Sequence, residues 1–322
     1  MGPQPVEKIQ QSVRVTPELA GQRLDQAAAA LFRGFSRSRL QEWIRSGALL
    51  VDGRTARPRD RVRGSEELFL EAEPEPEVSA GPQDLGLEPL YRDDHLLVLD
   101  KPAGLVVHPA AGHADGTLLN GLLALDPALE LLPRAGIVHR LDRDTTGLMV
   151  VARSLEAHAG LVDQLQRRTL KREYMAVATG VLTGGGTVEA PIGRHPADRK
   201  RMAVRDTGRP AVTHYRLEER FRGHTLVRVR LETGRTHQIR VHMAHLRHPL
   251  AGDPVYGGRP RFPAGATEAL RQALQRFRRQ ALHAAELGFE HPVTGETMSF
   301  QAPLPEDLAG LLDVLRADRE AS

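Results

Sequence analysis

The 322-residue chain contains no cysteine. Disulfide bonds, iron–sulfur clusters, Cys-ligated zinc and a thiol nucleophile are therefore excluded, and the absence fits a reducing compartment. Aromatic residues are scarce at 4%, with a single tryptophan. No stretch approaches the roughly 18 apolar residues of a membrane span. Because the first ten residues also lack the pattern of a signal peptide, we expect a soluble cytoplasmic protein.

Lysine is also rare, with four residues against 40 arginines, and the net charge is only +3. A GC-rich genome explains the preference for arginine but not where the charges lie. Residues 14–63 carry a net charge of +6, residues 66–100 carry −10, and residues 194–247 carry +9. Two basic blocks separated by an acidic one indicate two surfaces for a polyanion such as nucleic acid.

The length suggests two domains, at about 150 residues per domain. Residues 71–89 are rich in Pro, Glu and Gly and lack apolar periodicity, which is typical of an interdomain linker. The sequence therefore predicts a small unit at 12–75, a linker at 76–89, a large unit at 90–310 and a C-terminal tail at 311–322.

Two helices and a tight turn are predicted in the small unit. Residues 22–32 are rich in Ala and Leu, a second helix begins at Ser36, and Asp52-Gly53 forms a hairpin turn between short strands. The arginines of the second helix and the turn predict RNA binding, against the alternative of a solvated charged face; they are Arg37, Arg39, Arg45 and Arg54. The unit resembles an S4 RNA-binding domain in the order of its segments 23–25, 36–40, Gly47 and 51–53.

The large unit mixes predicted strands and helices without a regular βαβ rhythm. Strands are predicted at 96–99, 105–107, 147–151, 174–177 and 226–231, and a helix at 154–168 with Ser154 as its N-cap. This pattern favours an α+β fold around a mixed, largely antiparallel sheet.

Polar residues are concentrated at 139–147, immediately before a predicted strand. Asp142 and Asp144 lie there among His139, Arg140 and Arg143. A sheet edge positions such loop residues rigidly, as in many functional sites. A salt-bridged turn that satisfies only its own backbone donors is equally consistent with the composition.

A second polar cluster lies at 233–242, where Arg235 precedes a predicted helix and could hold a carboxylate or a phosphate. Four histidines follow, at His237, His242, His245 and His248. Their spacing is not HExxH and no acidic residue lies among them, so a metal site is not expected.

Seven segments, in order, resemble the RluA-type pseudouridine synthases: 101–109, 139–147, 171–174, 231–243, 252–257, 279–284 and 291–296. With the S4-like unit, the resemblance spans roughly residues 12–305. It implies a pseudouridine synthase fold and the isomerisation of uridine in structured RNA. The reaction adds no group, so it implies no organic cofactor, metal or energy source.

The resemblance also implies roles for individual residues. Asp142 matches the catalytic aspartate, for which attack at C1′, attack at C6 and removal of the 2′ proton stay open. The family pattern places Arg235 against this carboxylate. Tyr174 matches the residue that stacks on the target base and removes its C5 proton, and Arg140 the residue that fills the vacated stack.

Large-subunit ribosomal RNA is the partner that the resemblance implies, with no protein partner. Two other functions are weaker alternatives: a non-catalytic RNA-binding factor of ribosome assembly, and a metal-dependent phosphohydrolase. The trio of Asp142, Tyr174 and Arg235 argues against the first, since a binding module needs none of it, and sparse carboxylate clustering argues against the second.

Overall fold

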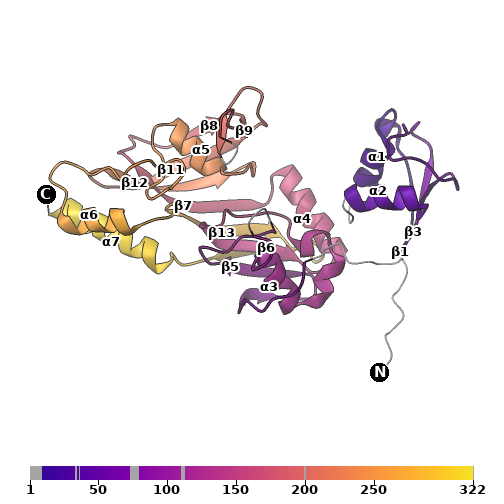
Figure 1. The fold of residues 1–322 in the computed structure, drawn as a ribbon, viewed down its shortest axis with the longest axis horizontal. Coiled ribbons are helices and arrows are strands. Elements are labelled where there is room, and N and C mark those ends of the chain that lie inside the picture. Colours follow the sequence, from indigo (N-terminus) through magenta and orange to yellow (C-terminus); the bar gives the residue numbers. More distant parts are fainter. Residues whose placement is uncertain are drawn as a thin grey trace.

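A computed structural model describes residues 9–32, 35, 37–72, 80–109, 113–198 and 201–321. The described chain forms a small and a large unit (Figure 1), and each has its own hydrophobic core. Among these residues, no helix combines the length and the apolar character that crossing a membrane requires.

The small unit is a three-stranded antiparallel sheet with two helices. Its strands are β1 (Ile9–Arg14), β2 (Leu49–Val51) and β3 (Glu67–Ala72), in the order β1-β3-β2. The helices are α1 (Leu24–Leu31) and α2 (Arg37–Ser46), preceded by the short 3₁₀ helix η1 (Pro17–Leu19). Both predicted helices are present, while Ser36 lies outside the described residues. Trp43 and Ile44 of α2 are buried in the core of this unit.

The predicted hairpin in the small unit is only partly formed. Asp52 and Gly53 make the turn with positive φ angles of 47° and 72°, and Val51 pairs with Arg54 in a single bridge. The partner strand of β2 is β3, because β3 alternates exposed and buried residues and so supplies an apolar face. Residues 54–60, directly after the turn, are exposed or half-buried and supply no such face.

The large unit is built on a nine-stranded sheet. Its strands are β4 (Pro89–Arg92), β5 (Leu96–Lys101), β6 (Thr146–Ala152), β7 (Lys171–Thr179), β8 (Gly186–Glu189), β11 (Val212–Arg220), β12 (His224–Leu231), β13 (Leu282–Glu290) and β14 (Thr297–Gln301). Their order is β4-β5-β6-β13-β7-β12-β11-β8, with β14 paired to β13. Among the described residues, β6 and β13 form the one parallel pair of this sheet. The predicted mixed, largely antiparallel α+β fold is confirmed.

Helices cover the sheet and close its ends (Figure 1). They are α3 (Leu118–Leu125), η2 (Pro127–Leu131), η3 (Pro133–Gly136), α4 (Leu155–Arg167), α5 (Gln238–His245), α6 (Glu268–Arg276) and α7 (Glu306–Glu320). Ser154 caps α4 as predicted, because its hydroxyl accepts the Ala157 N–H at 3.1 Å. A two-stranded ribbon of β9 (Ile192–Arg194) and β10 (Met202–Val204) completes the unit.

The strand predicted at 105–107 is absent. Instead, the carbonyls of Val106 and Val107 accept the N–H groups of Leu118 and Leu119, so this loop satisfies the first donors of α3. Val107 is buried in the main core. The apolar run therefore reflects burial of a loop and not strand pairing.

The predicted domain boundaries differ from the structure at both ends of the large unit. Residues 80–88 pack on α3: the Asn120 side chain donates to the Gly81 carbonyl at 2.8 Å, and Leu87 joins the core. Residues 311–320 belong to α7, where Leu311 and Leu315 are buried. The predicted tail is therefore part of the folded unit, because its leucines recur on one helical face.

Candidate active site

The segment 139–147 leads into β6, and a pocket of about 790 Å³ opens beside it. The pocket is lined from this loop, from β7 and from the turn between β12 and α5. The sequence-predicted site residues of the large unit all line it: Asp142, Tyr174, Arg235 and Arg140. Three segments far apart in sequence thus meet at one cavity of the sheet.

Asp142 forms an ion pair with Arg240 of α5. Arg240 Nη1 donates to Asp142 Oδ2 at 2.9 Å, and its other edge holds Asp253 through two bonds of 2.7 and 2.9 Å. The side chains of Arg240 and Asp253 are 5% and 0% exposed, and that of Asp142 is 16% exposed. Burial disfavours the charge on Arg240, but the bonds to Asp253 and Asp142 raise its pKa above the usual value. A permanently charged guanidinium therefore fixes one oxygen of Asp142 and leaves the other toward the pocket.

The expected pairing of Arg235 with Asp142 is wrong. Arg235 lies in the turn before α5, where its Nε donates to the Pro210 carbonyl at 3.0 Å. The first turn of the helix carries the chain inward, so that Arg240 and not Arg235 reaches the carboxylate. The one hint in the sequence is that Arg240 stands between the apolar residues Ile239 and Val241, a position that favours burial. Buried arginines usually have a carboxylate partner.

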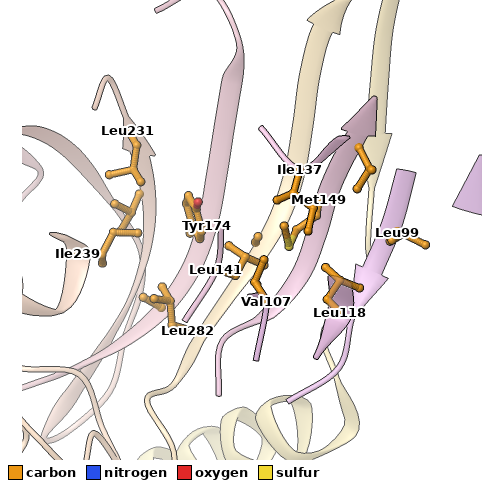
Figure 2. Close-up of a cluster of buried hydrophobic side chains, with 14 of the residues drawn as sticks. Leu99, Val107, Leu118, Ile137, Leu141, Met149, Tyr174, Leu231, Ile239 and Leu282 are labelled. Carbon is orange, nitrogen blue, oxygen red and sulfur yellow. The ribbon is translucent and has the colours of Figure 1, made fainter. Parts of the chain in front are cut away.

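Tyr174 lies on β7 with its ring in the main core (Figure 2). Burial raises the pKa of its phenol, so the hydroxyl is protonated at neutral pH. Arg172, two residues earlier on the same strand, also lines the pocket and is only 7% exposed. Its Nε has no hydrogen-bond partner among the described residues. Because the Arg172 guanidinium lines the pocket beside Tyr174, it favours the binding of an anionic or carbonyl group of a ligand.

His139 supports the strand rather than the chemistry. Its Nε2 accepts the Val150 N–H at 3.1 Å, so its proton is on Nδ1. Burial lowers the pKa of His139 to about 3, with the charge of Arg172 adding to the effect. The ring is therefore neutral at physiological pH, and the lone pair on its Nε2 is already engaged by the Val150 N–H.

Lys101 connects the loop that contains Asp142 to the loop that follows β5. Its buried ammonium donates to the carbonyls of Pro102, Leu105 and Arg143 at 2.8, 3.0 and 2.8 Å. Burial lowers the pKa of Lys101 to about 8. Because three carbonyls use its three protons, Lys101 fixes the backbone that follows Asp142.

The remaining wall of the pocket is basic and exposed. Arg134 and Arg140 line it, and both side chains are exposed. Burial lowers the pKa of the nearby His108 to about 4, and the two guanidinium charges add to this shift. The positive potential at this wall suits an incoming phosphate backbone.

The S4-type arginines fall into two groups. Arg37 pairs with the buried Asp25 at 2.8 Å, and Arg39 is largely buried with its guanidinium over the ring of Trp43. Arg45 and Arg54 are exposed. Arg39 therefore offers a ligand the least of its guanidinium, whereas Arg37 is about half exposed although it is paired.

The histidines after Arg235 are dispersed among structural contacts. His242 bonds to Thr213 and to the Ala190 carbonyl, and His248 bonds to the Thr179 carbonyl. No three His, Asp or Glu side chains of the described chain are grouped in a way that could hold a metal ion.

Comparison with known proteins agrees with this architecture. The family model described as RNA pseudouridylate synthase matches residues 95–245, and the S4 domain model matches residues 22–68. The human protein RNA Pseudouridylate Synthase Domain Containing 4 superposes with a TM-score of 0.55 at 26% identity, covering 71% of this chain and 92% of that one.

Relatives match along nearly the whole chain. Ribosomal large subunit pseudouridine synthase D of Pseudomonas aeruginosa is 60% identical over 97% of this chain and 98% of its own length. The protein of the same name in Xanthomonas campestris is 58% identical over 99% of this chain and 97% of its own. The one in Escherichia coli K12 is 54% identical over 98% and 97%. With these relatives and this site, the chain belongs to the RNA pseudouridylate synthase family and is an RNA pseudouridine synthase that carries an N-terminal S4 domain.

Proposed function

We propose that this enzyme isomerises specific uridines of large-subunit ribosomal RNA, with Asp142 as its essential carboxylate. The observation that carries the proposal is the buried chain Asp142–Arg240–Asp253, which presents a single half-free carboxylate to a pocket with Tyr174 in its wall. The substrate class rests on the full-length relatives, whose names specify the ribosomal large subunit.

The geometry supports a division of roles in the reaction. In the isomerisation, the N1–C1′ bond of the uridine breaks, C5 bonds to C1′, the C5 proton leaves and N1 takes up a proton. Asp142, held by Arg240 through one oxygen, acts on the ribose or the base through its other oxygen. Arg240 serves as the partner that was expected of Arg235.

Tyr174 supplies the stacking surface and the proton path. Its ring is held by the core, so it presents a fixed face to a flipped uracil. Because its phenol is protonated at neutral pH, the hydroxyl can receive the C5 proton only if it passes its own proton on in the same step. Tyr174→Phe should therefore bind RNA normally and lose turnover.

The exposed arginines hold the RNA. Arg140 fills the stack that the flipped uridine leaves, since its planar guanidinium can both stack and hold phosphate. Arg235, half-buried at the rim, contacts the RNA backbone rather than Asp142. Arg172 receives an acceptor of the nucleotide deeper in the pocket.

Two measurements test the proposal. Pseudouridine mapping of ribosomal RNA from a strain that lacks this protein should show the loss of specific large-subunit sites, and complementation should restore them. Loss confined to transfer RNA would contradict the proposed substrate. On a short hairpin that folds without metal, turnover should survive excess EDTA, whereas a metal-dependent phosphohydrolase would stop.

A further inference from the structure

The imidazole of His237 lies near the oxygen of Asp142 that Arg240 does not hold. Its Nε2 is 3.9 Å from Asp142 Oδ1, while Arg240 holds Oδ2 at 2.9 Å. The His237 side chain is 20% exposed and lines the pocket. Each carboxylate oxygen is thus faced by a different nitrogen. The contact between His237 Nε2 and Oδ1 is attractive if Nε2 carries a proton and repulsive if it carries a lone pair.

Tyr256 determines which nitrogen of His237 carries the proton. The Met202 N–H donates to Tyr256 Oη at 2.9 Å, and the same hydroxyl lies 2.9 Å from His237 Nδ1. With Met202 as the donor to its oxygen, the phenol directs its single proton to Nδ1, which leaves the imidazole proton on Nε2. The opposite tautomer would point a lone pair at the Asp142 carboxylate.

The surroundings of His237 keep its imidazole neutral and hold the Tyr256 ring in place. Burial lowers the pKa of His237, and the charges of Arg240 and Arg140 lower it further. The charges of Asp142 and Asp253 raise this pKa, but the net shift is downward. The Tyr256 ring lies under two guanidinium groups, those of Arg201 at 5.4 Å and Arg240 at 5.1 Å.

The backbone of His237 is also unusual. Its φ of 56° places it in the left-handed region, at the residue before α5. Such a conformation is strained for a residue other than glycine. The strain is offset here by the placement of the ring between Tyr256 and Asp142. Asparagine tolerates this backbone region well, which provides a substitution with little strain.

We propose that His237, set by Tyr256 in the form protonated at Nε2, is a positioning residue that orients the free oxygen of Asp142 for attack. The inference rests on the proposed role of Asp142. Because the contact spans 3.9 Å, it closes to a hydrogen bond when the bound nucleotide excludes water from the pocket. His237 then acts on turnover and not on RNA affinity.

The principal test is His237→Asn measured against His245→Asn. The asparagine oxygen can still accept the Tyr256 proton, but no donor reaches Asp142. His245 is an exposed histidine at the end of the same helix, and its substitution controls for the loss of an imidazole. We expect kcat to fall about 10- to 100-fold in His237→Asn, with KM for RNA within about two-fold. His245→Asn should match wild type.

Two further variants separate positioning from folding. His237→Gln carries an amide donor at the reach of Nε2 and should recover part of the kcat that the asparagine variant loses. Tyr256→Phe should lower kcat in the wild-type background and have no further effect in His237→Asn, because the hydroxyl acts through the imidazole. Thermal unfolding of each variant reports whether the fold is kept.

Several outcomes would overturn the inference. They are an unchanged kcat in His237→Asn, a raised KM with normal kcat, or multiplicative losses from the tyrosine and histidine variants. If the enzyme makes pseudouridine, Asp142→Asn abolishes turnover and His237→Asn does not change it, only the inference about His237 is wrong. Normal turnover by Asp142→Asn removes the proposed function itself.

Discussion

One buried aspartate holds two arginines in the small unit, whereas one buried arginine holds two aspartates in the large unit. Asp25 is fully buried and pairs with Arg23 at 3.0 Å and Arg37 at 2.8 Å, both of which are about half exposed. Arg240 is buried and joins Asp253 to Asp142, of which only Asp142 reaches the pocket.

The ratio of arginines to aspartates, two to one in the small unit and one to two in the large unit, suits the function expected of each unit. In the S4 domain, the carboxylate fixes arginines whose outer edges stay in water, which suits display of positive charge to RNA. In the catalytic unit, the guanidinium fixes a carboxylate whose free edge faces a cavity, which suits chemistry on a bound nucleotide. An Arg–Asp pair thus suits binding in one region and, on the proposed function, reactivity in the other.

The largest expected effect is that of Asp142→Asn, which keeps the shape of the catalytic cluster and removes its reactive charge. Pseudouridine formation should fall by at least about 10³-fold, with RNA affinity within a few-fold of wild type. Tritium release from C5-labelled uridine measures turnover. Asp144→Asn is the matched control, since Asp144 pairs with the exposed Arg143 and should tolerate the change. Turnover by Asp142→Asn at a rate close to that of wild type would show that the carboxylate is not required for the reaction.

Arg240→Ala breaks the cluster at its centre and should be nearly as severe. It leaves the buried Asp253 without its ionic partner and with only the backbone N–H groups of Val255 and Tyr256 as donors, which costs about 3–5 kcal/mol of unfolding free energy, and it frees Asp142 from its orientation. Arg235→Ala should keep the thermal stability and much of kcat and chiefly raise KM, because the Arg235 side chain donates to the Pro210 carbonyl at the surface and its backbone bonds to Gln238 are kept in the variant. If the alanine at 235 were inactive and the one at 240 active, Arg235 would regain the role expected from the sequence.

Local features of the fold could be predicted from the sequence, whereas features that depend on distant residues could not. The α+β class, the helix at 154–168 with its Ser154 cap and the strands around Tyr174 follow from local patterns, because caps and apolar alternation act over a few residues. The segment 105–107 was wrongly predicted as a strand, since burial of a loop gives the same apolar run as strand pairing. The predicted tail failed for a related reason: the packing of α7 on α6 depends on residues distant in sequence.

The site divides in the same way. The grouping of Asp142, Tyr174 and Arg140 around one pocket agrees with the motif-based expectation. The partner of Asp142 could not be assigned from spacing, because Arg235 and Arg240 lie in one motif and the direction of α5 alone decides which reaches the carboxylate. Tyr256 was missed altogether, since its contact with His237 joins segments that no local pattern connects.

A smaller effect is expected from Asp25→Ala in the S4 domain. Although burial alone would raise it, hydrogen bonds from Arg23, Arg37 and Gln41 hold the pKa of Asp25 well below its usual range. A group with a depressed pKa stabilises the fold above its unfolded value of about 3.9, and this stabilisation is lost as the pH falls below that value. The variant should lose about 1–3 kcal/mol at neutral pH and much of the acid sensitivity of this domain.

Fluorescence of the single tryptophan measures this effect selectively, because Trp43 lies in the S4 core. Wild type and Asp25→Ala should differ in stability at pH 7 and converge toward pH 2. The turnover of the folded variant on a minimal substrate should remain, since the catalytic cluster is untouched. Equal stability at both pH values would show that Asp25 does not stabilise this domain.

The smallest effects should come from the exposed arginines of the S4 domain. Arg45→Gln and Arg54→Gln each remove one exposed guanidinium that no aspartate of the described residues holds, so each should weaken RNA binding and lower the slope of log affinity against log salt by about 1. Arg39→Gln is the contrasting variant, because that guanidinium is largely buried over Trp43. It should lower the stability reported by Trp43 fluorescence and leave the salt slope nearly unchanged. If Arg39→Gln changed the slope as much as Arg45→Gln, exposure in the free protein would not identify the RNA-binding arginines, and the S4 domain would have to rearrange on RNA.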